Sequence, residues 1–216
     1  MSKKIAVVLS GCGFKDGSEI TEAISTVVTL SELNCDVKIF APNHEMPATD
    51  HLSGEPLAKR NLLSESARIA RGEVTDLKKL DANQFDAVVF PGGYGAALNL
   101  CTWGKEGSKG SVLPEVQKAV EDFHSQNKPI GAICIAPALI AKILGKHKVT
   151  LTIGNDKETA SEIEKTGAIH TTCKVDDFIT DRENKVISTP AYMYDAKPFE
   201  VFTGIRKALK ELVEMA

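Results

Sequence analysis

The sequence predicts an α/β fold in which a mainly parallel sheet is covered by helices on both faces. Short, fully apolar runs alternate with amphipathic stretches along most of the 216 residues. Strands that are apolar on both sides are typical of parallel sheets, because crossover helices cover both faces of such sheets. No internal repeat, linker or low-complexity segment interrupts the alternation, so we expect one domain over residues 1–216.

The predicted strands are the short apolar runs bounded by turn residues. In chain order they lie over Lys4–Leu9, Asp36–Ala41, Phe85–Phe90, Pro129–Cys134, Lys148–Ile153 and within Asp177–Thr189. Pro42 stops the second strand, and the stretch from Asn43 to about Arg60 is expected to be a loop. Functional sites are then expected at the carboxyl ends of the parallel strands.

The predicted helices are the stretches whose apolar residues recur at helical spacing. In chain order they lie over Ser18–Leu33, Asn61–Arg71, Pro114–Ser125, Ala136–Leu144, Lys157–Lys165 and Lys197–Met215. In the first of them the spacing is that of Ile20, Ile24, Val27 and Val28. Gly72 and Gly167 end two others, as glycines do after the last helical turn.

Composition excludes several classes of partner. The 26 Lys and Arg against 29 Asp and Glu leave a net charge of −3, without a block of like charges, so we expect neither a nucleic-acid nor a membrane partner. The apolar run Ile5–Leu9 is too short for a signal peptide. The 5 cysteines show no zinc-binding spacing and no CxxC pair, which indicates reduced thiols in a cytoplasmic protein without a metal.

The strongest chemical signal is the segment around Cys134. A buried strand ends at this cysteine and a helix begins at once, which is the layout of a nucleophile elbow. The small residues Ala132 and Ala136 flank the turn, and Pro137 suits a first helical turn. The helix N-terminus is expected to stabilise a thiolate. The alternative is that Cys134 is a small buried side chain at a strand end.

The second signal is the Pro91-Gly92-Gly93 turn after the strand Phe85–Phe90. Glycines there let backbone amides approach a ligand closely. Beside the elbow, we expect the amides of Gly93 and Ile135 to form an oxyanion hole. Alone, the turn would be an ordinary tight turn.

The third signal is the glycine-rich segment over residues 10–20. Its glycines give GxGxxxG, one residue too long for a dinucleotide fingerprint, so we expect no NAD or other cofactor. Glu19 follows it and is either a first-turn acid that favours the helix dipole or the partner of Cys134. As a partner it would be protonated and donate a hydrogen bond to the thiolate. Cys12 lies in the same turn and is either a buried structural thiol or a second thiol of the pocket.

Together these segments resemble the ThiJ/PfpI side of the class I glutamine amidotransferase-like superfamily. Five segments are similar to those of the ElbB group, whose members are described as isoprenoid biosynthesis proteins with an amidotransferase-like domain. These segments are SGCGFKDGSEI, FPGGYGAALNL, ICIAPA, LTIG and TPAYM. The resemblance implies a flavodoxin-like three-layer sandwich, commonly homodimeric, with a reactive Cys134, Glu19 as its hydrogen-bonded acid, and Gly93 and Ile135 as oxyanion donors.

The resemblance also implies an activity. ElbB-like proteins have been assigned a weak, cofactor-free glyoxalase activity on small 2-oxoaldehydes, sometimes reinterpreted as deglycation. The PfpI-type peptidases have a histidine after the nucleophile, where this chain has Ile135. Glutaminase domains carry a late His-x-Glu pair, whereas Thr172 stands two residues after His170. We therefore expect neither peptidase nor glutaminase activity, and His170 is either structural or a pocket residue.

Our leading hypothesis is an enzyme that converts glyoxal or methylglyoxal to glycolate or lactate through Cys134. The rival hypotheses are a redox- or metabolite-sensing protein in which Cys134 is modified, with Cys12 near it, and a binding module of isoprenoid metabolism. Oxidation of Cys134 by mild peroxide or metabolite-induced thermal shifts would separate them. An exposed Trp103 and the loop around Gly104–Gly110, within residues 101–113, are candidates for an interface or a lid.

Overall fold

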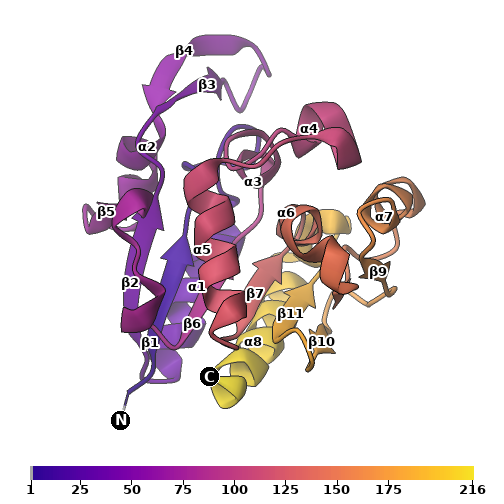
Figure 1. Cartoon of the computed structure of the whole chain (residues 1–216). Coiled ribbons are helices and arrows are strands. Elements are labelled where there is room, and N and C mark those ends of the chain that lie inside the picture. The colour runs from indigo at the N-terminus through magenta and orange to yellow at the C-terminus, as the bar shows by residue number, and fades with distance from the viewer. Residues whose placement is uncertain (1) are drawn as a thin grey trace.

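The computed structural model describes residues 2–216 and contains a central sheet of seven strands in the order β10-β11-β7-β6-β1-β2-β5 (Figure 1). Only the edge strand β10 runs antiparallel to its neighbour, β11. The strands of this sheet are β1 (Lys4–Val8), β2 (Asp36–Ala41), β5 (Val74–Asp76), β6 (Ala87–Phe90), β7 (Ile130–Ile133), β10 (Ile179–Asp181) and β11 (Val186–Thr189). The predicted mainly parallel sheet with helices around it is confirmed.

Helices cover both faces of the sheet. The helices are α1 (Ile20–Glu32), α2 (Leu62–Ile69), α3 (Tyr94–Leu98), α4 (Trp103–Glu106), α5 (Pro114–Ser125), α6 (Ala136–Leu144), α7 (Lys157–Glu164) and α8 (Pro198–Met215). Helices α1 and α8 pack together behind the sheet in Figure 1, and α3, α5 and α6 lie in front of it. None of the helices described has the length and apolar character needed to cross a bilayer.

The core consists of two apolar layers, one on each side of the sheet. Alternate residues of β1 point to opposite layers, so Ile5 and Val7 pack towards α8 while Ala6 and Val8 pack towards α5 and α6. The strands in the middle of the sheet are fully buried, as their apolar sequences require. This arrangement brings the carboxyl ends of β1, β6 and β7 to one edge, where the loops that follow them meet.

The prediction of a loop from Asn43 to about Arg60 is wrong. This stretch forms a hairpin of β3 (Glu45–Thr49) and β4 (Pro56–Asn61). The hairpin projects from the body next to α2 (Figure 1). Its strand β4 is almost entirely exposed and has no buried apolar run, so periodicity gave no signal for it. A further pair of two-residue strands, β8 (Thr150–Leu151) and β9 (Ile169–His170), lies beside α7.

The prediction of an exposed Trp103 is wrong. The indole is buried in the core layer that contains α5 and α6, and the segment around it is α4 followed by a short 3₁₀ turn. Thr102 and Ser111 hold the two ends of this segment together by a backbone hydrogen bond of 2.9 Å. The segment is therefore anchored by its own tryptophan.

Candidate active site

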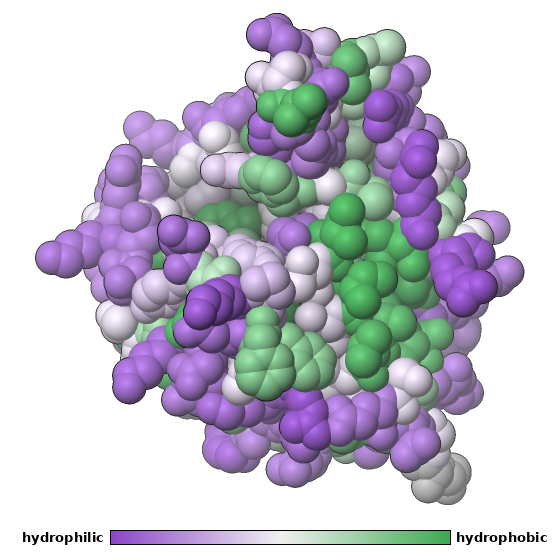
Figure 2. Space-filling model, turned by 180° about the vertical axis from the view of Figure 1, so that it is seen from behind, coloured by the Kyte–Doolittle hydropathy of each residue, from purple (hydrophilic) through white to green (hydrophobic). Residues whose placement is uncertain are grey.

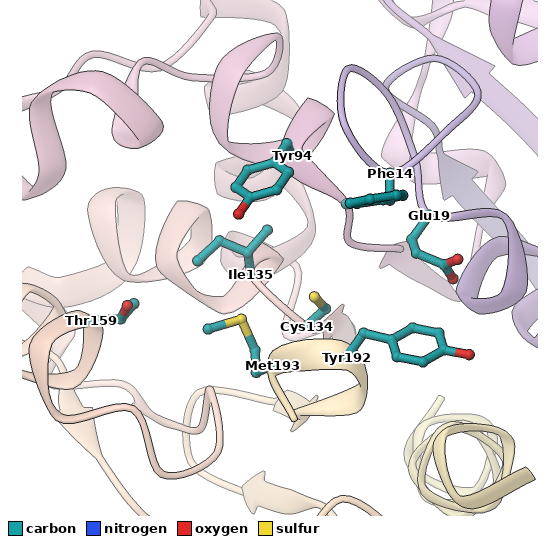
Figure 3. A pocket seen from close by; sticks show the side chains of 9 residues that line it. Phe14, Glu19, Tyr94, Cys134, Ile135, Thr159, Tyr192 and Met193 are labelled. Atoms are coloured by element: carbon teal, nitrogen blue, oxygen red, sulfur yellow. The ribbon is translucent and has the colours of Figure 1, made fainter. Parts of the chain in front are cut away.

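Cys134 stands at the turn between β7 and α6, as the elbow motif predicted. Its backbone has φ = 63°, a left-handed conformation that is uncommon for a residue with a side chain. The amide of Cys134 donates to the carbonyl of Thr189 on the neighbouring strand β11, at 2.9 Å, which fixes the turn. The thiol is thereby held at the carboxyl edge of the sheet, where it lines a cavity of about 530 Å³ (Figure 3).

The amides of Gly93 and Ile135 both donate hydrogen bonds to the sulfur of Cys134. Gly93 has φ = 91°, and a Cβ there would lie 2.4 Å from the amide nitrogen of Glu19, so only glycine fits the turn after β6. Ile135 directly precedes α6 and presents its amide from the helix N-terminus. The structure thus brings these two predicted donors together around the sulfur.

The acid bonded to Cys134 is Glu22, which sequence reasoning missed, and not Glu19. Glu22 lies in the first turn of α1, fully buried, and its carboxyl group shares a hydrogen bond with the thiol of Cys134. The amides of Gly92, at 3.0 Å, and Tyr192, at 3.3 Å, donate to its two oxygens. Three segments far apart in the sequence therefore fix this one carboxyl group.

Glu19 precedes the helix and has an extended backbone, so its side chain caps α1 instead. Its Oε2 accepts a hydrogen bond of 2.7 Å from the amide of Glu22, as N-cap residues do. The prediction of a hydrogen bond from Glu19 to Cys134 is therefore wrong, because the Glu19 carboxylate is used to cap α1. Glu19 still lines the cavity, one helical turn before the buried acid.

Burial, together with the negative charge of Glu19, raises the pKa of Glu22 to about 8. At neutral pH this carboxyl group therefore holds a proton. Burial raises the pKa of the Cys134 thiol well above its usual range, and an ionised Glu22 raises it further, whereas the amides of Gly93 and Ile135 lower it. The pair therefore carries at most one negative charge, and a protonated Glu22 is the state that permits a thiolate.

The remaining cavity wall is mainly aromatic and apolar. The side chains beside those already described come from four segments and are Phe14, Tyr94, Thr159, Tyr192 and Met193. Tyr192 and Met193 belong to the turn after β11. Its sequence, TPAYM, contributed to the family resemblance but was not predicted to be part of the site. Exposed Phe14 and Tyr94 carried no sequence signal of their own.

The two other candidates lie outside the cavity. His170 accepts a hydrogen bond from the amide of Ile153 at 3.3 Å, and burial lowers its pKa, which indicates a structural role. Burial raises the pKa of the Cys12 thiol, and its charged neighbours are Glu65, Arg68 and Asp16. Neither side chain lines the cavity, so Cys12 is not a second thiol of the pocket. Among residues 2–216, no cluster of three or more potential metal ligands occurs.

Comparison with solved structures places the whole chain in a known architecture. The crystal structure of an isoprenoid biosynthesis protein with an amidotransferase-like domain from Ehrlichia chaffeensis is 38% identical and superposes with a TM-score of 0.94, over 99% of each chain. Drosophila melanogaster DJ-1beta, at 20% identity, superposes with a TM-score of 0.57 over 100% of this chain and 91% of its own, which shows the fold alone.

Curated relatives cover nearly the same length. The human glutamine amidotransferase-like class 1 domain-containing protein 3, mitochondrial, is 42% identical over 98% of this chain and 83% of its own. The zebrafish (Danio rerio) ES1 protein, mitochondrial, is 37% identical over 98% of this chain and 85% of its own. The prediction of a cytoplasmic protein is wrong on this evidence, because these relatives are named mitochondrial proteins.

The DJ-1/PfpI family matches residues 3–181, which include β1, the glycine turn after β6 and the elbow at Cys134. Members of that family include glyoxalase- and deglycase-like proteins. The ThiJ/PfpI resemblance of the sequence is thereby confirmed, and the chain belongs to the DJ-1/PfpI family.

Proposed function

We propose that this chain is a cysteine-dependent, cofactor-independent glyoxalase-like enzyme that converts glyoxal to glycolate and methylglyoxal to lactate. The observation that carries the proposal is the pair of Cys134 and Glu22, joined by a hydrogen bond: Cys134 lines the cavity, Glu22 is buried behind it, and two backbone amides are directed at the sulfur. A thiol beside a protonated acid and a pair of N–H donors suits addition to a small carbonyl compound.

The first step is addition of the thiol to the aldehyde carbon. A carbon–sulfur bond forms, the aldehyde π bond breaks, and the oxygen that gains charge is stabilised by the amides of Gly93 and Ile135 before it takes a proton. Glu22 is the carboxyl group bonded to the sulfur and carries the proton between sulfur and oxygen. The product of this step is a hemithioacetal on Cys134.

The second step moves hydrogen within the bound substrate. In its ionised state, Glu22 removes the proton from the carbon attached to sulfur, and the neighbouring carbonyl oxygen takes up a proton, which gives an enediol. Glu22 then gives its proton to the neighbouring carbon, and the hydroxyl on the first carbon releases the proton that balances the one taken up. The first carbon is thereby oxidised to a thioester and the second reduced to an alcohol, so no external oxidant or reductant takes part. Water then hydrolyses the thioester and releases the hydroxy acid and the free thiol.

The absence of a histidine from the cavity wall, within residues 2–216, predicts slow turnover. A high thiol pKa leaves little thiolate at neutral pH, and Glu22 alone serves as acid and base. We expect activity at the low end for enzymes, on the order of 1 s⁻¹ or less.

The test is product formation from glyoxal without added glutathione or metal, followed by proton NMR. We expect the wild type to form glycolate, and we expect Glu22→Gln to lower the rate of glycolate formation by about 100-fold or more, as for loss of a general acid–base group. Cys35→Ser is the matched control, because Cys35 lies outside the cavity, and it should retain the wild-type rate. No glycolate from the wild type, or an unchanged rate in Glu22→Gln, would refute the proposal.

We also propose that the chain forms a homodimer through the outer face of α1. Ile20, Ile24 and Val28 are 48%, 42% and 51% exposed, and their spacing of four residues aligns them along one ridge. Figure 2 shows a continuous apolar area on the face where α1 and α8 lie. The ridge carries no charge, so a second copy of the same ridge matches it without unpaired charges, as a two-fold interface requires.

A further inference from the structure

The cavity wall carries one charged side chain, and that charge is negative. Glu19 is an acid, whereas the other side chains that line the cavity are aromatic, aliphatic, a thioether, a thiol and a hydroxyl. No Lys, Arg or His among residues 2–216 contributes to this wall. A ligand with a carboxylate or phosphate near its carbonyl group would therefore face a like charge and find no cation to pair with.

The carboxylate of Glu19 has one oxygen available to a ligand. Oε2 accepts the hydrogen bond from the amide of Glu22 that caps α1, at 2.7 Å, while Oε1 accepts none from the residues described. The cap fixes the direction of the side chain, so the free oxygen is held at the cavity wall. A fixed carboxylate oxygen in a partly desolvated site favours a donor that carries positive charge.

Two exposed aromatic rings line the cavity, and one of them, Phe14, lies beside Glu19. Phe14 is 46% exposed and Tyr94 is 57% exposed, and the amide of Tyr94 donates to the carbonyl of Phe14 at 2.8 Å, which ties their two loops together. Figure 3 shows Phe14 next to Glu19, and Tyr94 over Ile135, while the hydroxyl of Tyr192 points away. Aromatic faces beside a carboxylate are the elements that bind ammonium groups in proteins.

A cation already lies near one of these rings. The Nζ of Lys15 is 6.0 Å from the centroid of the Phe14 ring, at the outer limit of a cation–π contact. Lys15 does not line the cavity, and its ammonium group lies near Gly54 on the hairpin. The cavity side of the rings is thus left to a ligand.

We propose that the cavity selects carbonyl substrates that carry an ammonium group close to the reacting carbon and disfavours those that carry a carboxylate or phosphate. Glu19 is the residue that determines this specificity, and Phe14 and Tyr94 provide the aromatic walls. The inference rests on the proposed function for the carbonyl chemistry, but the charge preference of the cavity is measurable without turnover.

The test uses three alkylating reagents that differ in charge: 2-bromoethylammonium, iodoacetamide and iodoacetate. The rate of modification of Cys134 in the folded chain is followed by peptide mass spectrometry and divided by the rate for free cysteine. The ratio of the normalised cationic rate to the normalised anionic rate reports the charge preference. Any change in the thiol pKa cancels in this ratio, because all three reagents react with the same thiolate.

In the wild type we expect the normalised modification rate to be highest for the cationic reagent, lower for the neutral one and lowest for the anionic one. In Glu19→Gln the cationic-to-anionic ratio should fall about tenfold. This is the effect of removing one unit charge several ångströms away, at an effective dielectric constant of about 20 and with partial screening by salt. Glutamine retains an oxygen that can cap α1. Glu115→Gln, in the first turn of α5, is the matched control and should leave the ratio unchanged. Phe14→Leu should slow the cationic reagent selectively.

An equal ratio in wild type and Glu19→Gln would overturn the proposal, as would faster modification by iodoacetate than by 2-bromoethylammonium. Alkylation requires no aldehyde turnover. A chain that fails to form glycolate but shows the charge preference would therefore refute the proposed function and leave the specificity inference standing. A chain that forms glycolate without a charge preference would refute the specificity inference and leave the proposed function standing.

Discussion

The carboxyl group of Glu22 and the thiol of Cys134 are joined by a hydrogen bond at the buried edge of the sheet, on α1 and on the turn after β7 respectively. Burial and the neighbouring Glu19 raise the pKa of the carboxyl group to about 8, so it is protonated at neutral pH. Because two adjacent negative charges disfavour each other, the protonation state of one group sets the reactivity of the other.

Replacement of Glu22 by glutamine should lower the pKa of the Cys134 thiol. Burial is the main cause of the high thiol pKa and persists in the variant, but the negative charge that Glu22 carries above about pH 8 is removed. Thiolate ultraviolet absorbance against pH measures this, with Cys134→Ala used to assign the signal. An equal or higher thiol pKa in Glu22→Gln would contradict the assignment. The variant should thus be a better nucleophile and a poorer catalyst.

The same pair predicts a pH-dependent stability. The pKa of Glu22 is 4.5 in the reference state and about 8 in the folded chain, so between these values the folded state binds more protons than the unfolded state. The free energy of unfolding therefore falls as pH rises through this window. Glu22→Gln removes the dependence and should be more stable than wild type at about pH 8, by on the order of a few kcal/mol.

Thermal denaturation at about pH 5 and about pH 8 checks this prediction. The melting temperature of Glu22→Gln relative to wild type should be clearly higher at the upper pH than at the lower. Glu19→Gln should show a weaker effect in the same direction, because its negative charge contributes to the raised pKa of Glu22. A difference between Glu22→Gln and wild type that is independent of pH would indicate that the buried carboxyl group is ionised throughout.

Gly92→Ala should abolish glycolate formation. A Cβ at Gly92 would lie 2.4 Å from the Cβ of Cys134 and 2.7 Å from Oε2 of Glu22, so it would drive the pair apart. Gly72→Ala is the matched control, because a Cβ there meets nothing within 4 Å, although its φ of +93° is strained. The control should lose some thermal stability and keep its activity. Full activity in Gly92→Ala would show that the close packing of the pair is dispensable.

Ile24→Glu should convert the proposed homodimer to a monomer. The side chain is 42% exposed in the middle of the apolar ridge of α1, so a charge there is tolerated by the fold but would be buried against a second copy. Sedimentation velocity measures the mass of each species. Ile169→Glu, at an exposed isoleucine outside α1, should remain dimeric. A wild-type chain that is monomeric would refute the dimer directly.

The sequence predicted the strands and helices of the sheet layers closely because their periodicity is strong. The predicted helices over Pro114–Ser125 and Ala136–Leu144 match α5 and α6 to the residue, and the strand over Asp36–Ala41 matches β2. The hairpin of β3 and β4 was missed because β4 is almost entirely exposed and neither strand is a continuous apolar run. Trp103 was misplaced because no pattern of neighbouring residues indicated which side of its turn is buried.

The elbow and its two amide donors were recognisable because small residues, glycines and a helix start coincide in sequence around Cys134. The acid was not, since choosing between Glu19 and Glu22 depends on where α1 begins. The helix begins at Ile20, so its inward face carries Glu22, Thr26 and Leu30, while Ile20, Ile24 and Val28 face outwards. An apolar ridge at helical spacing identified the helix but not which of its faces is buried.

Whether the thiol of Cys134 is the nucleophile is decided by the rate of glycolate formation from glyoxal in the Cys134→Ala chain, measured beside the wild type and Cys35→Ser under the same conditions. We expect the alanine variant to fall to the uncatalysed rate while Cys35→Ser is unaffected. Glycolate formation at the wild-type rate in Cys134→Ala would contradict this expectation.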